Sequence, residues 1–480
     1  MTSYDVVVIG AGLGGLATAA ILTKAGRKVL VIERSNSVGG AASSYKVGDL
    51  FVEGSLHETS DPHDPRDPKH DVLTRAGVLD TVTFVPAGAL YEARGGPLDT
   101  PFVLPDNFEA ASAALATRFP DQREPVAQLF AQMRAVIAGD TTDATLSLQD
   151  KLDDLFGDDE PIKCALAANL AYYHDDPATL AWTHFATAQG RYLASGGRYV
   201  QGGSQRLSSA LARIVMRGGG EVALRRVVTS VDVEANTVTH SAKDGSDPKT
   251  LGYERLVSNA APATLAALLG GGAGRTLMDS YADQSPSISL FALTLGLSKP
   301  PRAFGFTGYS TQLLPTWLRR LADFKAGTTL MKDEPGDRMP PLSIVDYAAI
   351  DSGVPAPPYV LSIFGPDHLS NWDESDMDAY RDKRGRWQDA IVAALDGVYP
   401  GVKDAIVASS FNSALSVRQY LNAPNGAVYG FAPSPGAPPP SPKTVLPRLY
   451  LSSAYAGGGG YTGVLQSAGL CADLILRQHH

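Results

Sequence analysis

The sequence YDVVVIGAGLGG, residues Tyr4–Gly15, joins a valine-rich run to a cluster of glycines. Its first six residues are typical of a strand that is buried on both faces of a parallel sheet. The glycines match the pattern G-x-G-x-x-G at Gly10, Gly12 and Gly15. Leu16–Ala25 then has helical periodicity and strong helix formers, so the stretch predicts a strand, a tight turn and a helix in that order.

A second buried strand, Lys28–Ile32, follows this helix and leads into Glu33, 23 residues after Gly10. In such a unit the first glycine makes the tight turn, the second lets the backbone approach a pyrophosphate, and the third lets the helix pack on the strand. The N–H groups at the helix N-terminus can bind phosphates, and Glu33 can accept hydrogen bonds from a ribose. This order and spacing predict a dinucleotide-binding unit; a glycine-rich turn without a ligand is the alternative.

The composition is that of a globular protein of 480 residues, long enough for two or three domains. The net charge of −9 disfavours a nucleic-acid partner, whose phosphates need a basic surface. The two cysteines, Cys164 and Cys471, are far apart, so we expect no disulfide framework and no cysteine zinc site. With no apolar run of membrane-spanning length and no signal peptide, we expect a cytoplasmic protein, soluble or attached to a membrane surface.

A second pair of glycines follows in Val38–Tyr45, VGGAASSY. Here the sequence resembles the FAD-dependent family of amine oxidases, phytoene desaturases, carotenoid isomerases and retinol saturases. The resemblance implies that Gly39 and Gly40 let the chain pass along the phosphates of FAD; Ala41 stands where many amine oxidases have arginine. It also implies an α/β fold, in which a discontinuous Rossmann-like FAD-binding domain carries an inserted α+β substrate-binding domain.

Three further segments resemble the same family: Arg191–Val231, Leu256–Pro262 and Ser413–Phe431. In the first, Val228 matches a valine whose backbone meets the adenine. The resemblance is weaker elsewhere, which implies the following division. The FAD-binding domain takes residues 1–75, 191–290 and 412–480, and the substrate-binding domain takes residues 76–190 and 291–411.

The last flavin segment is Ala454–Gly463, AYAGGGGYTG. The resemblance implies that Gly457–Gly460 forms a loop under the isoalloxazine ring, with side chains excluded because flavin and substrate need the space. The following helix, Leu465–Leu476, would begin at Thr462–Val464 and stabilise negative charge at flavin N1 and O2. A flexible glycine hinge is the alternative. Ser452-Ser453 stands where many amine oxidases have Gly-Asp, which favours the polyene-acting branch.

The cofactor-binding residues that we expect from these motifs fall into four groups along the chain. They are Gly10, Gly12, Leu13, Gly14 and Gly15; Glu33, Arg34, Gly39, Gly40, Ala41 and Ala42; Val228; and Gly460, Tyr461, Thr462, Gly463 and Val464.

Two residues are catalytic candidates. His57 ends the segment FVEGSLH, which resembles the family's return towards the flavin, and its unperturbed pKa near neutrality suits a proton relay. In a strand, Glu53 would share a face with Ser55 and His57. The alternative is that His57 only packs or bonds to a loop. Tyr461, after the glycine loop, is a gatekeeper of the ring or a packing residue.

Two other segments suggest partners. His57–Asp71, HETSDPHDPRDPKHD, has histidines and aspartates, but Asp-Pro pairs form turns, so we expect a solvated loop and no metal site. Leu313–Lys325 predicts an amphipathic helix with Trp317, Leu318 and Phe324 on one side. Such a helix covers a substrate pocket or lies on a membrane.

The resemblance implies an FAD-dependent oxidoreductase that desaturates, saturates or isomerises carbon–carbon bonds of a lipophilic polyene or isoprenoid-like substrate. The chemistry would be hydride transfer to or from flavin N5, with oxygen, a quinone or a nicotinamide as electron acceptor. An amine oxidase that uses oxygen is the first alternative. The second is a lipid-binding protein that resembles Rab GDP dissociation inhibitors, which the intact glycine motifs disfavour.

Overall fold

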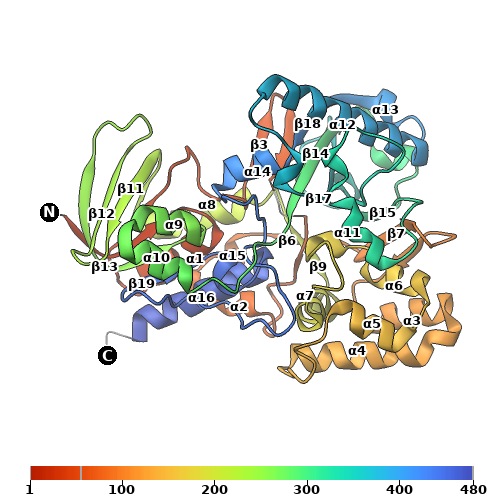
Figure 1. Cartoon of the computed structure of the whole chain (residues 1–480), viewed down its shortest axis with the longest axis horizontal. Helices are drawn as coiled ribbons and strands as arrows, with labels where there is room; N and C mark the ends of the chain where they lie inside the picture. The colour runs from red at the N-terminus through yellow and green to blue at the C-terminus, as the bar shows by residue number, and fades with distance from the viewer. Residues whose placement is uncertain (1, 55–56, 478–480) are drawn as a thin grey trace.

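The computed structural model describes residues 2–54 and 57–477, and this part of the chain forms two lobes, each built on a seven-stranded sheet (Figure 1). The first sheet has the order β10-β2-β1-β13-β12-β11, and β19 also pairs with β13. Its strands are β1 (Ser3–Ile9), β2 (Val29–Ile32), β10 (Glu221–Ala223), β11 (Arg226–Asp232), β12 (Thr237–Ala242), β13 (Lys249–Ser258) and β19 (Leu449–Leu451).

The valine-rich strand β1 lies in the interior of this sheet and runs parallel to both β2 and β13. Val6 and Val8 belong to the apolar core on one face, whereas Val7 and Ile9 belong to the core on the other face. Burial on both faces explains why the strand has no polar alternation.

Helices cover both faces of the first sheet, as Figure 1 shows at the left. One face packs on α1 (Leu13–Lys24), α2 (Pro68–Ala76), α8 (Gln205–Arg217) and α16 (Gly460–Arg477). The other face packs on α9 (Pro262–Leu269) and α10 (Gly271–Asp279). This is the doubly wound α/β arrangement that the sequence predicts.

Segments from far along the chain complete the first lobe. β19 pairs in parallel with the end of β13, with Leu449 opposite Leu256 and Leu451 opposite Ser258. α16 packs against α1. The hydroxyl of Thr18 on α1 lies 2.8 Å from the hydroxyl of Ser452, which directly follows β19. The nucleotide-binding turn after β1 therefore rests on elements that come more than 400 residues later.

The second lobe contains the other seven-stranded sheet, in the order β18-β14-β17-β16-β15-β7-β8. Its strands are β7 (Tyr91–Gly95), β8 (Phe102–Leu104), β14 (Ser289–Leu297), β15 (Ser310–Leu314), β16 (Leu342–Asp346), β17 (Tyr359–Asp367) and β18 (Ile406–Asn412). Its helices are α3 (Phe108–Arg118), α4 (Arg123–Ile137), α5 (Leu148–Phe156), α6 (Glu160–Ala167), α7 (Trp182–Ser195), α11 (Phe324–Gly327), α12 (Met377–Val398), α13 (Val402–Ala405) and α14 (Ala414–Leu421).

The two faces of this sheet differ in character. On one face, Leu293 of β14 and Ile363 of β17 share an apolar core with Trp387 of α12, so α12 covers this face. Thr294 and Ser362 are opposite each other in the register of β14 and β17, and by alternation they lie on the other face, as does Phe364. That second face is mixed polar and aromatic.

Two small sheets connect the lobes. β3 (Ser44–Val47) and β4 (Leu50–Glu53) form a hairpin, and β9 (Gly197–Val200) lies between β5 (Thr59–Ser60) and β6 (Phe84–Pro86). β4 ends at Glu53, and Ser55 lies outside the described residues, so the shared strand face predicted for Glu53, Ser55 and His57 is not part of the described strand.

The amphipathic helix predicted over Leu313–Lys325 is wrong. Leu313 belongs to β15, where it pairs with Leu342 on one side and Arg94 on the other. After Pro315 the chain forms only a short 3₁₀ turn, Leu321–Asp323, and the four-residue helix α11. The apolar residues of the segment are buried core residues and do not form a surface for a membrane; they are Leu318, Leu321 and Phe324.

Candidate functional site

The turn between β1 and α1 has the geometry of a phosphate cradle. Gly10 has a φ of 93°, which favours glycine. A Cβ on Gly15 would lie 2.5 Å from the carbonyl oxygen of Gly10, so helix and strand need glycine at this contact. Gly12 is the N-cap of α1 and no side chain caps the helix, which leaves the N–H groups of its first turn for an anion.

The second pair of glycines lies against this turn. The N–H of Gly39 donates to the carbonyl of Ala11 over 2.8 Å, and Gly12 and Gly39 form a parallel bridge. Gly39 and Gly40 have φ values of 122° and 58°. Ala42 is held from behind, where its carbonyl accepts the hydroxyl of Ser208 over 2.7 Å. The two glycine segments thus form one continuous wall.

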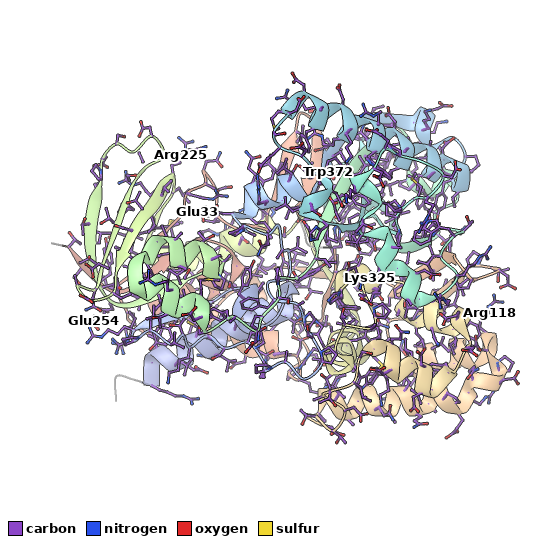
Figure 2. All side chains as sticks on the ribbon, viewed as in Figure 1. Glu33, Arg118, Arg225, Glu254, Lys325 and Trp372 are labelled. Atoms are coloured by element: carbon purple, nitrogen blue, oxygen red, sulfur yellow. The ribbon has the colours of Figure 1, made fainter. Side chains whose placement is uncertain are left out.

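Glu33 is buried at the end of β2, beside the turn. One carboxylate oxygen accepts the N–H of Ala11 over 2.7 Å, and the other accepts the N–H of Ser35 over 2.8 Å. In Figure 2 the side chain of Glu33 lies just below Arg225, on the side of the first lobe that faces the second lobe. The carboxylate is therefore fixed in place next to the glycine turn, where a ribose would reach it.

Two further predicted residues lie near Glu33: Arg34 follows it directly in the chain, and the strand that holds Val228 begins beside it. Val228 is on β11, whose first residue, Arg226, donates its N–H to the carbonyl of Glu33 over 2.8 Å. The guanidinium of Arg34 donates to the carbonyls of Gln419 and Tyr420 at the end of α14, each over 2.8 Å. Arg34 therefore joins the first lobe to α14.

Two residues that the sequence reasoning missed close the back of the cradle. A Cβ on Gly12 would lie 2.1 Å from Oδ1 of Asn259, and a Cβ on Gly14 would lie 2.4 Å from the carbonyl oxygen of Ser452. The side-chain N–H of Asn259 also donates to this carbonyl. The signal for Asn259 was its place directly after β13; the signal for Ser452 was its place directly after β19.

Contacts within the protein also require glycine at two of the C-terminal positions, beside the space that we expect the flavin to need. α15 (Ala454–Gly457) precedes them, and α16 begins at Gly460, before the predicted start at Thr462–Val464. A Cβ on Gly457 would lie 2.3 Å from the carbonyl oxygen of Gly463, and a Cβ on Gly459 would lie 2.4 Å from Cβ of Tyr429. Close packing of the protein itself therefore already excludes side chains at both positions.

His57 lies among aromatic residues of the second lobe. Its ring stacks on Phe364, with centroids 4.7 Å apart and an interplanar angle of 8°. Its Nδ1 lies 3.1 Å from the hydroxyl of Tyr347, and the hydroxyl of Tyr309 donates to its carbonyl. Tyr172 meets Phe364 edge to face at 4.9 Å. Burial lowers the pKa of His57 to about 4, so the imidazole is neutral at pH 7.

Glu53 and Tyr461 lie on the other side of this group. The carboxylate of Glu53 accepts the hydroxyl of Tyr199 and the backbone N–H of Ser204, each over 3.0 Å, and the hydroxyl of Ser204. Burial raises the pKa of Glu53 to about 7, against the effect of these hydrogen bonds. The hydroxyl of Tyr461 is buried at the start of α16 and interacts with the side chain of Ser204, which joins it to the group around Glu53.

His184 is a second histidine at the site that the sequence reasoning missed. It lies on α7, and its Cε1 is 3.9 Å from where a Cβ on Gly458 would lie. Burial, and then the nearby charge of His174, lowers its pKa to about 4. The residues next to His184 in the sequence do not mark it as a site residue, because α7 meets the glycine turn only in the folded chain.

We expect acid to destabilise the protein through these two histidines. Each pKa falls from about 6.5 in the unfolded chain to about 4, so the unfolded state binds more protons between these values. This contribution to stability is complete above pH 6.5, falls progressively as the pH is lowered from 6.5 to 4, and is lost below pH 4. In urea unfolding, His57→Asn and His184→Asn should each reduce the loss of unfolding free energy between pH 7 and pH 5 by about 1–2 kcal/mol. The same change at the exposed His63 is the control; an equal effect there would contradict the assignment.

The segment His57–Asp71 forms turns, but it is not the solvated loop that we expected, because Ser60, Asp67 and Lys69 are buried and Pro68 begins α2. Asp61 and Asp64 each accept a backbone N–H from two residues further on, and Asp67 caps α2. Within residues 2–54 and 57–477, no group of three or more His, Cys, Asp or Glu is placed to hold a metal ion. In the same part of the chain, no helix is both long and apolar enough to span a membrane.

The site has the features that an FAD molecule needs. The uncapped N-terminus of α1 and the glycine wall suit the pyrophosphate, and the carboxylate of Glu33 suits the ribose. The start of α16, with its positive dipole end and the buried hydroxyl of Tyr461, suits the flavin ring.

Comparison with known proteins supports this arrangement. The model of the family described as "Flavin containing amine oxidoreductase" matches residues 13–300, more than half of the chain. All-trans-retinol 13,14-reductase of Homo sapiens is 23% identical, over 99% of this chain and 86% of that protein. Chloroplastic prolycopene isomerase of Daucus carota is 23% identical, over 99% of this chain and 81% of that protein. The crystal structure of an oxidoreductase from Methanosarcina mazei has a TM-score of 0.68 and 17% identity, over 98% of this chain and 99% of that one, and so has the same fold.

Proposed function

This chain belongs to the family of flavin-containing amine oxidoreductases, and from this premise we propose that it saturates or isomerises carbon–carbon double bonds of a lipophilic polyene. It is an FAD-dependent oxidoreductase. The observation that carries the proposal is the similarity over 99% of the chain to two proteins named for such reactions, a retinol 13,14-reductase and a prolycopene isomerase. A match of this extent includes the second lobe, where a substrate would bind.

The residues divide the work as follows. We assign the phosphates of FAD to the first turn of α1 and to Gly39-Gly40, the ribose to Glu33, and the flavin ring to the start of α16. When bound, FAD supplies the two-electron chemistry. We place the substrate in the substrate-binding domain, residues 76–190 and 291–411, which makes up most of the second lobe, and FAD in the domain of residues 1–75, 191–290 and 412–480.

His57 is the proposed proton relay. Its imidazole is neutral at pH 7 and Nδ1 contacts the hydroxyl of Tyr347, so Nε2 is left to exchange a proton with a substrate carbon. Phe364 and Tyr172 form an aromatic wall beside it, which suits the flat, apolar body of a polyene. Tyr461 fixes the ring edge at the start of α16.

The amine oxidase activity is the second candidate, because the matching family model is named for it. Ser452-Ser453 follows β19 where many amine oxidases have Gly-Asp, so Ser453 stands in the place of the acid, and this disfavours the amine reaction.

The test is the visible spectrum of the FAD-loaded protein under anaerobic conditions. We expect a yellow protein whose chemically reduced flavin reoxidises when all-trans-retinol is added, or which converts prolycopene without net oxidation. Oxygen, a quinone and a nicotinamide are then compared as electron partners. Reduction of the flavin by primary amines, with peroxide release and no response to polyenes, would replace the proposal by the amine reaction. A protein that takes up no FAD would leave lipid binding.

A further inference from the structure

A lysine is completely buried behind the start of α16. Lys69 of α2 has 1% of its surface exposed. Its ammonium donates to the hydroxyl of Ser60 over 2.6 Å, to the carboxylate of Asp67 over 2.8 Å and to the hydroxyl of Thr462 over 2.9 Å. All three of its protons are therefore used, and the last hydrogen bond reaches the first turn of α16.

The charges around Lys69 do not cancel. Arg191 of α7 acts on Lys69 as a second positive charge, and its buried Nε has no hydrogen-bond partner among the described residues. Asp67 is the only carboxylate that contacts Lys69 within the described chain. Asp61 acts on Lys69 by its charge without contact, and it is itself paired with Arg198 over 2.8 Å. Two cations and one carboxylate leave a net charge of about +1 in a protein whose total charge is −9.

The charged form of Lys69 is present at pH 7. Burial is the main cause that lowers its pKa; Asp67 and Asp61 oppose this change and Arg191 adds to it, and the resulting pKa is about 8. The groups that face the ammonium from α2, β5, α7 and α16 are thus Asp67, Ser60, Arg191 and Thr462. No carboxylate of α16 reaches it in the described structure.

We propose that Lys69 is a positioning residue that adds its positive charge to the N-terminus of α16 and thereby stabilises the reduced, negatively charged form of the flavin. The inference rests on the proposed place of the flavin ring at this helix. The helix dipole alone offers about half a unit charge, which falls off within one turn. Lys69 adds a full charge directly behind that turn, in an interior that solvent does not screen.

The expected size of the effect is that of one unit charge acting through the protein interior at an effective dielectric constant of about 20. Loss of this charge should reduce the equilibrium ratio of reduced to oxidised flavin about tenfold, which for a two-electron couple is about 30 mV.

The experiment measures the midpoint potential of the FAD-loaded protein by spectroscopic titration against a redox dye. Lys69→Met should lower the potential, whereas Lys69→Arg should keep the ratio of reduced to oxidised flavin within threefold of wild type. Thr462→Val removes the link but not the charge, so we expect little change. The matched control is Lys163→Met, because Lys163 is also a buried lysine paired with two acids, Asp153 and Glu160, far from α16.

A merely structural role would give a different pattern. Lys69→Met and Lys163→Met would then both lower the melting temperature and both leave the potential unchanged, and the proposal would be overturned. Should Lys69→Met not fold, the wild-type protein still decides. Its midpoint potential should fall more steeply with pH above about 8, where Lys69 loses its charge, and a slope that does not change across pH 8 would overturn the proposal. Because no substrate is used, a failure with polyenes would reject the proposed function and leave this inference intact.

Discussion

Gly14→Ala should lose FAD, although the pattern G-x-G-x-x-G leaves this position free. A Cβ here would lie 2.4 Å from the carbonyl oxygen of Ser452 and 2.8 Å from its carbon, and both are backbone atoms. α1 and β19 cannot separate easily, because β19 is hydrogen-bonded to β13. We expect FAD affinity to fall at least about 100-fold and the free energy of unfolding to fall by about 1–3 kcal/mol, as for overpacked cores.

The control is the same substitution in another helix. Gly385 lies on α12, and nothing lies within 4 Å of the position of an added Cβ. Gly385→Ala should leave FAD binding unchanged and stabilise the protein by up to about 1 kcal/mol. FAD affinity is measured by fluorescence titration, and stability by urea unfolding of the apoprotein. If Gly14→Ala binds FAD like wild type, the contact between α1 and Ser452 is not a constraint.

His57→Asn should reduce turnover about 100-fold or more, the usual loss when a proton-transfer group is removed. Asparagine keeps a polar atom near the place of Nδ1, so the contact with Tyr347 is retained, but it has no atom at the place of Nε2. The visible spectrum and the affinity for FAD should not change, since the contacts given for His57 all lie in the second lobe.

Tyr347→Phe separates the relay from simple packing. It removes the hydroxyl 3.1 Å from Nδ1 but keeps the ring, so we expect about a tenfold loss in turnover and a changed pH profile. Rates are compared in single turnovers with the polyene that the wild-type protein accepts. Turnover of His57→Asn within a factor of three of wild type would show that His57 only packs on Phe364.

The nucleotide-binding unit could be predicted from the sequence because its elements are local. The predicted strand Tyr4–Ile9 and helix Leu16–Ala25 correspond to β1 and α1. Buried parallel strands are continuous apolar runs, and the glycines mark the turn between strand and helix. The family and FAD-dependent activity implied by these motifs were confirmed by the match to residues 13–300.

The errors arose where contacts between distant segments decide. Leu313–Lys325 has a helical pattern, but pairing with β7 and β16 and the break at Pro315 give a strand and a turn. The start of α16 was placed too late because glycine is a poor helix former, whereas Gly463 fits there under the carbonyls of Gly457 and Gly458.

The candidate site shows the same division. The glycines and Glu33 were found because each has a place in a local motif. Asn259, His184 and Lys69 were missed as site residues, since each reaches the site from a separate element and its neighbours in the sequence carry no sign of it. The assignments of His57, Tyr461 and the cofactor contacts remain predictions that the variants above test.

The late arrival of β19 and α16 has a consequence for synthesis on the ribosome. β1, α1 and β13 leave the ribosome early, but the edge of β13 that β19 covers stays open until residues 449–451 are made. At about 5–20 residues per second, the ~190 residues between these strands take on the order of 10–40 s. During that interval the nascent chain exposes an apolar edge and cannot bind its cofactor, so FAD can act as a folding ligand only after translation has almost reached α16.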